Sequence, residues 1–168
     1  MRLFLYFASK KQMKAKSSKK DNPPLGPGAS REWSLKERLE AIAAFAPVFD
    51  APDFSPGELV RAKQIAENAW EAGWFRNSEE ISQFLSVCYQ YGWVCDFDWV
   101  KWSNTKECKA FLDRPELIEK ANALQLAKLL TTMMRSEHFA DGSVAEAFEQ
   151  GVIRWIVARS LLLCADIS

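Results

Sequence analysis

The chain has 168 residues, 48% of them hydrophobic and 26% charged, which is the balance of one globular domain of ordinary size. Seven Trp and eleven Phe residues predict a substantial core, and no apolar stretch is long enough to span a membrane. The formal net charge is zero but uneven, since residues 1–31 carry +7 and residues 32–168 carry −7. We therefore predict a basic tail, residues 1–31, attached to an acidic body, residues 32–168.

The N-terminal segment resembles a targeting peptide only superficially. Its apolar run, Leu3–Ala8, is shorter than the hydrophobic part of a secretory signal, and most of the positive charge follows this run. Met13 offers a second start, which would make residues 1–12 an upstream extension. The stretch Lys10–Ser30 is rich in Lys, Ser, Pro and Gly and has almost nothing to bury, so it is expected to form a flexible tail.

Helical periodicity begins at Ser34 and continues to the end of the chain. Apolar residues recur at helical spacing, and Ser34 with Glu37 and Ser143 with Glu146 have the spacing of capping boxes. The expected helices are about 34–46, 55–72, 78–91, 98–111, 113–135, 143–150 and 152–163. No segment shows sustained strand alternation. The predicted fold class is all-α, a single compact domain of six or seven helices.

The second expected helix depends on its end signals. Ser55 can cap it, Pro56 takes the first helical position, and Gly73 follows its last residue, Ala72.

The four cysteines, Cys88, Cys95, Cys108 and Cys164, form no CxxC pair, and their spacing fits no common zinc pattern. Buried reduced thiols are favoured over metal or redox roles, so neither a metal nor a cofactor is predicted. Reduced thiols favour a cytoplasmic location.

Two pairs of tryptophans are spaced to share a helical face. Trp70 and Trp74 lie one turn apart, as Trp99 and Trp102 nearly do. An exposed pair would suit base stacking, but the body of the chain is acidic. Core packing is therefore favoured, and Trp99 is predicted to be a core residue.

The stretch TTMMRSEHFADGSVAEAFEQG, residues 131–151, holds the chain's one histidine, His138. Arg135 and His138 are spaced to project from one face of a helix end, and Glu137 and Asp141 are placed to orient an imidazole. A histidine with a carboxylate partner can perform general acid–base catalysis. These four residues are the candidate site if the protein is an enzyme or binds a nucleotide.

A structural interpretation explains the same stretch and is favoured. Arg135 and His138 stabilise the negative end of a helix dipole, and Phe139 anchors the turn in the core. Asp141 and Gly142 make the bend, and Ser143 caps the next helix. Only Glu137 is left without a structural role.

A family resemblance covers residues 38–162. Its most specific part, from Leu130-Thr131 through Arg135, Phe139 and Gly142 to Gly151, resembles a small uncharacterised prokaryotic family, domain of unknown function 6508. An Arg commonly stands in that family where this chain has His138, which argues against His138 as a catalytic base because Arg does not release a proton near neutral pH. The family has no settled activity, so the resemblance implies no function.

Three functions are carried forward. The first is a small helical accessory module that binds another macromolecule, with a protein of basic surface as the expected partner. The second is the enzyme or nucleotide-binding protein centred on the four site residues. It is less expected because no P-loop, GxGxxG, HExxH or GxSxG motif is present. The third is a nucleic-acid binder that uses the tail lysines Lys10, Lys11, Lys14, Lys16, Lys19 and Lys20.

Overall fold

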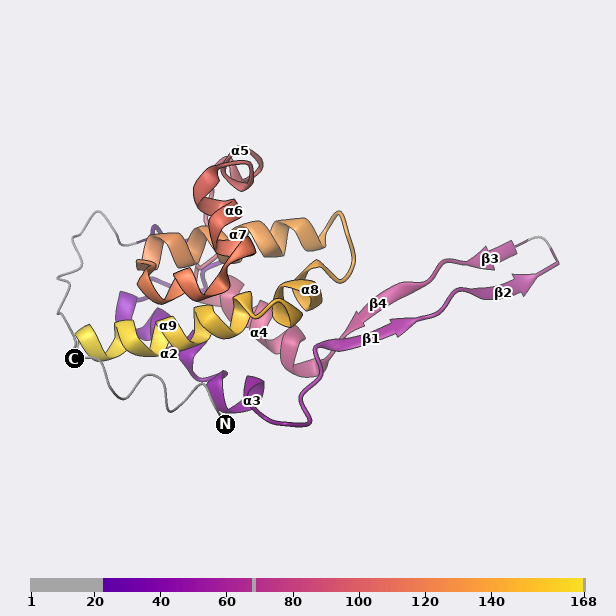
Figure 1. Ribbon diagram of the computed structural model, residues 1–168, viewed down its shortest axis with the longest axis horizontal. Coiled ribbons are helices and arrows are strands. Elements are labelled where there is room, and N and C mark those ends of the chain that lie inside the picture. The colour runs from indigo at the N-terminus through magenta and orange to yellow at the C-terminus, as the bar shows by residue number, and fades with distance from the viewer. Residues whose placement is uncertain (1–22, 68, 168) are drawn as a thin grey trace.

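Helices make up more than half of the described residues in the computed structural model, which describes residues 23–67 and 69–167 (Figure 1). The helices are α2 (Leu35–Ala43), α3 (Ala46–Phe49), α4 (Glu79–Gln90), α5 (Trp99–Ser103), α6 (Lys106–Asp113), the 3-10 helix η3 (Pro115–Lys120), α7 (Ala123–Glu137), α8 (Ser143–Glu149) and α9 (Val152–Ile167). The strands are β1 (Gly57–Val60), β2 (Lys63–Ala66), β3 (Ala69–Glu71) and β4 (Trp74–Asn77). The prediction of a mainly helical single domain is confirmed. The tail lysines lie outside the described residues.

The core lies where α9 packs along α2 and against η3 and α8 (Figure 1). Phe49 occupies one end of this core, 1% exposed, with the rings of Phe84 and Phe148 edge-on to it at centroid distances of 5.3 and 5.2 Å. Aromatic pairs in this geometry add to the stabilisation that burial alone gives. The heavy aromatic content therefore does build a core, as the composition predicts.

The described part of the predicted tail, residues 23–31, packs on the helical body instead of extending from it. Gly26 N–H donates to the Gly92 carbonyl at 2.9 Å, and Ser30 N–H donates to the Gln90 carbonyl at 3.0 Å. The buried Arg38 side chain of α2 donates to the carbonyls of Pro23 and Pro24 at 2.7 and 3.3 Å. These hydrogen bonds involve backbone N–H groups and carbonyls, which a segment rich in Lys, Ser, Pro and Gly also carries. The composition of the segment therefore did not predict that it packs on the body.

Residues 57–67 and 69–77 form a two-stranded ribbon that projects from the helical body, and we call it the arm (Figure 1). β1 pairs antiparallel with β4 near the body, and β2 pairs antiparallel with β3 toward the tip. The predicted helix from Ser55 to about Ala72 is therefore wrong. Gly73 lies between β3 and β4 instead of ending a helix.

Contacts between residues far apart in the sequence explain why the strands form. Gly57 has φ +150°, a conformation that other residues rarely adopt, and a Cβ at this position would lie 2.2 Å from the Arg76 carbonyl oxygen. Leu59 lies opposite Phe75 in the register, so large apolar residues pair across the ribbon. A local helical pattern carries no information about these partners.

Two other predicted helices are interrupted by caps. The helix expected over 98–111 is split into α5 and α6, because the Thr105 hydroxyl accepts from Cys108 N–H and starts α6. The helix expected over 113–135 is split into η3 and α7. Asn122 and Gln125 form a capping box there, and each side chain accepts from the other's backbone N–H. The capping box predicted at Ser34 and Glu37 is present.

Candidate functional site

The Glu137 carboxylate is the centre of the turn between α7 and α8. Its Oε2 accepts from Val144 N–H at 2.8 Å, and its Oε1 accepts from Gly142 N–H at 3.2 Å. Both donors are at the beginning of α8, where N–H groups have no partner within the helix, so the carboxylate caps α8. The Asn77 side-chain amide also donates to Oε1, at 3.2 Å. Because Asn77 ends β4, Glu137 fastens the arm to the body.

This geometry corrects the structural interpretation of the turn. Glu137, which seemed to have no structural role, supplies the cap that was assigned to Ser143. The N-cap residue is Gly142, with φ +88°, and Ser143 lies inside α8 with its hydroxyl donating to the Ala140 carbonyl at 2.7 Å. Glu146 accepts from the Gln150 amide at 3.0 Å instead of completing a capping box.

The other three candidate residues of this turn form no cluster with Glu137. His138 is exposed at the end of α7, with its Nε2 3.5 Å from the Tyr89 hydroxyl. Arg135 is half-buried and Asp141 is exposed, and neither side chain has a hydrogen bond or ion pair with another described residue. The Arg135 guanidinium therefore forms no ion pair with an acid across the turn. The catalytic hypothesis for these residues stays a prediction.

We expect Glu137→Ala to lower the free energy of unfolding by about 2 kcal/mol, because three donors lose a charged acceptor at once. Urea unfolding of the purified protein measures this change. Glu149→Ala, an exposed carboxylate of α8 with no such donors, is the control and should change stability by less than about 0.5 kcal/mol. Equal effects of the two substitutions would show that Glu137 is not the cap.

An exposed apolar surface lies beside this turn and the base of the arm. Phe139 is 81% exposed, and the half-buried Trp99 stacks on it at a centroid distance of 6.0 Å. The predictions that Phe139 is anchored in the core and that Trp99 is a core residue are therefore wrong. Figure 1 shows the α7–α8 turn beside the β1–β4 ribbon.

The arm contributes its own apolar residues to this region. A Cβ at Gly142 would lie 3.2 Å from the Phe75 ring, so Phe75 packs on the turn. Leu59 lies opposite Phe75 in the register, on the same face of the ribbon, and is 69% exposed. We call Leu59, Trp99 and Phe139 the arm–turn surface. The sequence signal for the arm is the pair of glycines, Gly57 and Gly73, in a segment that otherwise has the pattern of a helix.

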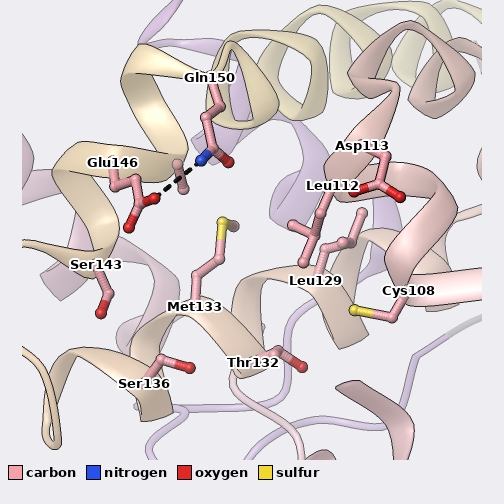
Figure 2. A pocket seen from close by; sticks show the side chains of 11 residues that line it. Cys108, Leu112, Asp113, Leu129, Thr132, Met133, Ser136, Ser143, Glu146 and Gln150 are labelled. Carbon is pink, nitrogen blue, oxygen red and sulfur yellow. Dashed lines mark hydrogen bonds between the residues drawn. The ribbon is translucent and has the colours of Figure 1, made fainter. Parts of the chain in front are cut away.

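A cavity of about 390 Å³ lies between α6, α7 and α8 (Figure 2). Its lining residues are Cys108, Leu112, Asp113, Leu129, Thr132, Met133, Ser136, Ser143, Glu146, Ala147 and Gln150. None of the four candidate residues of the turn lines this cavity. Within the described part of the chain, no group of His, Cys, Asp or Glu side chains is arranged to hold a metal ion. The described helices include none that is long and apolar enough to cross a membrane.

The buried thiols predict a loss of stability at alkaline pH. Burial raises the pKa of Cys108 from 9.0 to about 11, and it raises the pKa of Cys88 as well. Above about pH 9 these thiols ionise in the unfolded chain but stay protonated in the folded one, so the unfolded state binds fewer protons and stability falls as pH rises. Urea midpoints at about pH 8 and about pH 10 measure the loss. Cys88→Ala should lose less between the two pH values, and an unchanged loss would contradict this explanation.

The fold and the turn together define a class of protein, a mainly helical domain from which a β-ribbon arm projects. The chain belongs to a family of unknown function (DUF6508), whose model matches residues 34–164. This match confirms the resemblance noted in the sequence. No curated protein and no solved structure matches the chain.

Proposed function

We propose that this protein is a binding module that holds a protein partner through the arm–turn surface. The observation that carries the proposal is the arm, which leaves the helical body as a ribbon of only two strands (Figure 1). An isolated two-stranded hairpin is at best marginally stable in water and presents unpaired strand edges. A partner that packs on the arm would stabilise the ribbon and cover its unpaired strand edges.

The side chains of this surface support the same function. Leu59 and Phe139 are 69% and 81% exposed. Large apolar side chains that gather in one exposed region are typical of interaction sites, and aromatic residues supply much of the binding energy at protein interfaces. Glu137 holds the arm and the turn together, which fixes the two halves of the surface before a partner arrives.

The charge of the body indicates the kind of partner. Residues 32–168 carry a net charge of −7, so a protein with a basic surface is attracted and an acidic one is repelled. We expect the association rate to fall as salt rises, because screening weakens attraction between exposed charges. The dissociation rate, set by apolar contacts at the arm–turn surface, should change less.

The test combines identification of a partner with matched variants. Affinity capture from the native host, followed by purification, supplies a candidate partner whose Kd is measured with the full chain. Leu59→Ser and Phe139→Ser should each weaken binding by about tenfold or more, as expected for exposed anchors that become buried on binding. Leu161→Ser is the control, since Leu161 is 43% exposed on α9, away from the arm.

Thermal unfolding of each variant separates lost binding from lost folding. All three residues are exposed, so their replacement should leave the melting temperature within about 2 °C of the parent value. If Leu161→Ser weakens binding as much as Leu59→Ser and Phe139→Ser do, the arm–turn surface is not the binding site.

A further inference from the structure

The outer edge of the arm belongs to β1. β4 is the strand that contacts the body, because the Asn77 amide donates to Glu137 and Phe75 packs on Gly142 (Figure 1). β1 pairs with β4 and with no other described strand, and its Leu59 is 69% exposed. The other edge of β1 therefore carries backbone N–H and C=O groups that no described strand uses.

The hydrogen-bond pattern of the ribbon shows which groups are free on this edge. Ser78 N–H donates to the Pro56 carbonyl at 2.9 Å, so positions 56 and 78 form a hydrogen-bonded pair at the base of the arm. Hydrogen-bonded and non-hydrogen-bonded pairs alternate along an antiparallel ladder. Glu58 and Val60 are therefore bonded to β4, whereas the N–H and C=O groups of Leu59 point outward from the ribbon.

Arg61 continues this edge beyond β1. The last pair of β1 with β4 is Val60 with Trp74, and the β2–β3 ladder keeps the same register, so Arg61 lies across from Gly73 and its backbone groups also point outward. A Cβ at Gly73 would lie 3.6 Å from the Arg61 carbonyl carbon, in agreement with this placement. Glycine has no side chain to pair with the exposed Arg61, which forms no ion pair with a described residue. The edge thus offers an apolar side chain, Leu59, and an unpaired cation on one face.

We propose that the β1 edge accepts an extended strand of the protein partner, paired antiparallel, with an apolar residue opposite Leu59 and a Glu or Asp opposite Arg61. Strand addition to an exposed sheet edge is a common mode of peptide recognition, in which the backbone gives affinity and alternate side chains give specificity. Opposite charges across a strand pair stabilise it, and like charges destabilise it. This inference rests on the proposed function, since it names the part of the partner that meets the arm.

The charge of the edge favours this occupant over a second copy of the chain. Between Gly57 and Lys63, the face that holds Leu59 carries Arg61 and Lys63 and no acid on this strand. Two copies joined at the β1 edge would bring these cations together with no acid between them. A partner whose surface is basic elsewhere can still supply the acidic strand, because Arg61 lies beyond β1 on the part of the arm that projects from the acidic body (Figure 1).

Calorimetric titration of the full chain with synthetic peptides tests the proposal. The probe is acetyl-Thr-Thr-Glu-Val-Leu-Thr-Tyr-amide, whose Glu comes opposite Arg61 when its Leu lies opposite Leu59 in an antiparallel pair. It should bind with a Kd below about 1 mM, and the same peptide with Lys in place of Glu should bind about tenfold more weakly. Arg61→Glu should reverse this preference. Lys109→Glu, the same charge change on an exposed residue of α6, should leave it unchanged.

Backbone methylation distinguishes strand addition from side-chain contact alone. N-methylation of the peptide's Glu and Leu blocks the N–H groups that face the β1 edge and should abolish binding. N-methylation of its Val, whose N–H points away from the edge, should have little effect. In the complex, amide hydrogen exchange should slow at Leu59 and Arg61 and change less at Glu58, which is already bonded to β4.

Three results would overturn the inference. They are equal binding of the Glu and Lys peptides, binding of the peptide methylated at Glu and Leu, and a dimer of the free chain in sedimentation that Arg61→Glu disrupts. The last result would make the β1 edge an interface between copies. If no peptide binds at about 1 mM while Leu59→Ser and Phe139→Ser still weaken binding of the captured partner, strand addition is rejected and the proposed function stands.

Discussion

Arg38→Met is expected to lower the free energy of unfolding by about 3 kcal/mol, one of the two largest effects that we predict. The Arg38 side chain is 3% exposed and donates to four backbone carbonyls, those of Pro23, Pro24, Tyr91 and Gly92. It therefore joins α2 to the N-terminal segment and to the loop after α4. Methionine fills much of the same space but donates no hydrogen bond, so four carbonyls lose a charged donor.

Burial lowers the pKa of the Arg38 guanidinium, and no carboxylate pairs with it among the described residues. Its charge is stabilised by carbonyl dipoles and by the Trp93 ring, whose centroid lies 4.8 Å from the guanidinium carbon. We expect Arg38→Lys to be destabilising as well, because an ammonium group cannot reproduce the planar fork that reaches several carbonyls.

Urea unfolding measures both substitutions, and Arg31→Met is the matched control. Arg31 forms an ion pair with Glu37 at 2.8 Å, but its side chain is 57% exposed, so its loss should cost less than about 1 kcal/mol. If Arg38→Met and Arg31→Met are equally mild, the hydrogen bonds of Arg38 do not hold the N-terminal segment on the body.

Trp93→Ala is the other large effect, with an expected loss of about 3–5 kcal/mol, the range for a buried large ring. Trp93 is fully buried, and its indole N–H donates to the Arg38 carbonyl at 3.0 Å. The substitution removes apolar contacts, leaves a cavity and breaks this hydrogen bond. Urea unfolding measures this loss. If the slope of the unfolding free energy against urea concentration is unchanged, the substitution has altered stability and not the compactness of either state.

Trp99→Ala is the natural comparison because the sequence alone favoured Trp99 as a core residue. Trp99 is half-buried and its ring partner Phe139 is largely exposed, so its loss should cost about 1–2 kcal/mol. A loss for Trp99→Ala as large as that for Trp93→Ala would return Trp99 to the core and remove it from the arm–turn surface.

The sequence predicted the starts of helices well where a start depends only on contacts between residues close together in the chain. The Ser34–Glu37 capping box starts α2 as expected, and the Ser78 cap starts α4 where a helix was expected, because a cap is a contact across three positions. Gly142 likewise makes the bend expected after α7. At the candidate turn, the sequence left Glu137 without a structural role, because one of its donors, Asn77, comes from a distant strand.

The sequence by itself determined that the chain is a mainly helical domain of the DUF6508 family, because helical periodicity and family motifs are written in consecutive residues. Only the tertiary structure decided that the segment after Pro56 forms an arm of paired strands, that Phe139 faces solvent and that Arg38 is buried. Each of these depends on a partner far along the chain: Phe75 opposite Leu59, or the carbonyls that surround the Arg38 guanidinium. Strand pairing and burial are properties of residues brought together in space, and no local pattern specifies them.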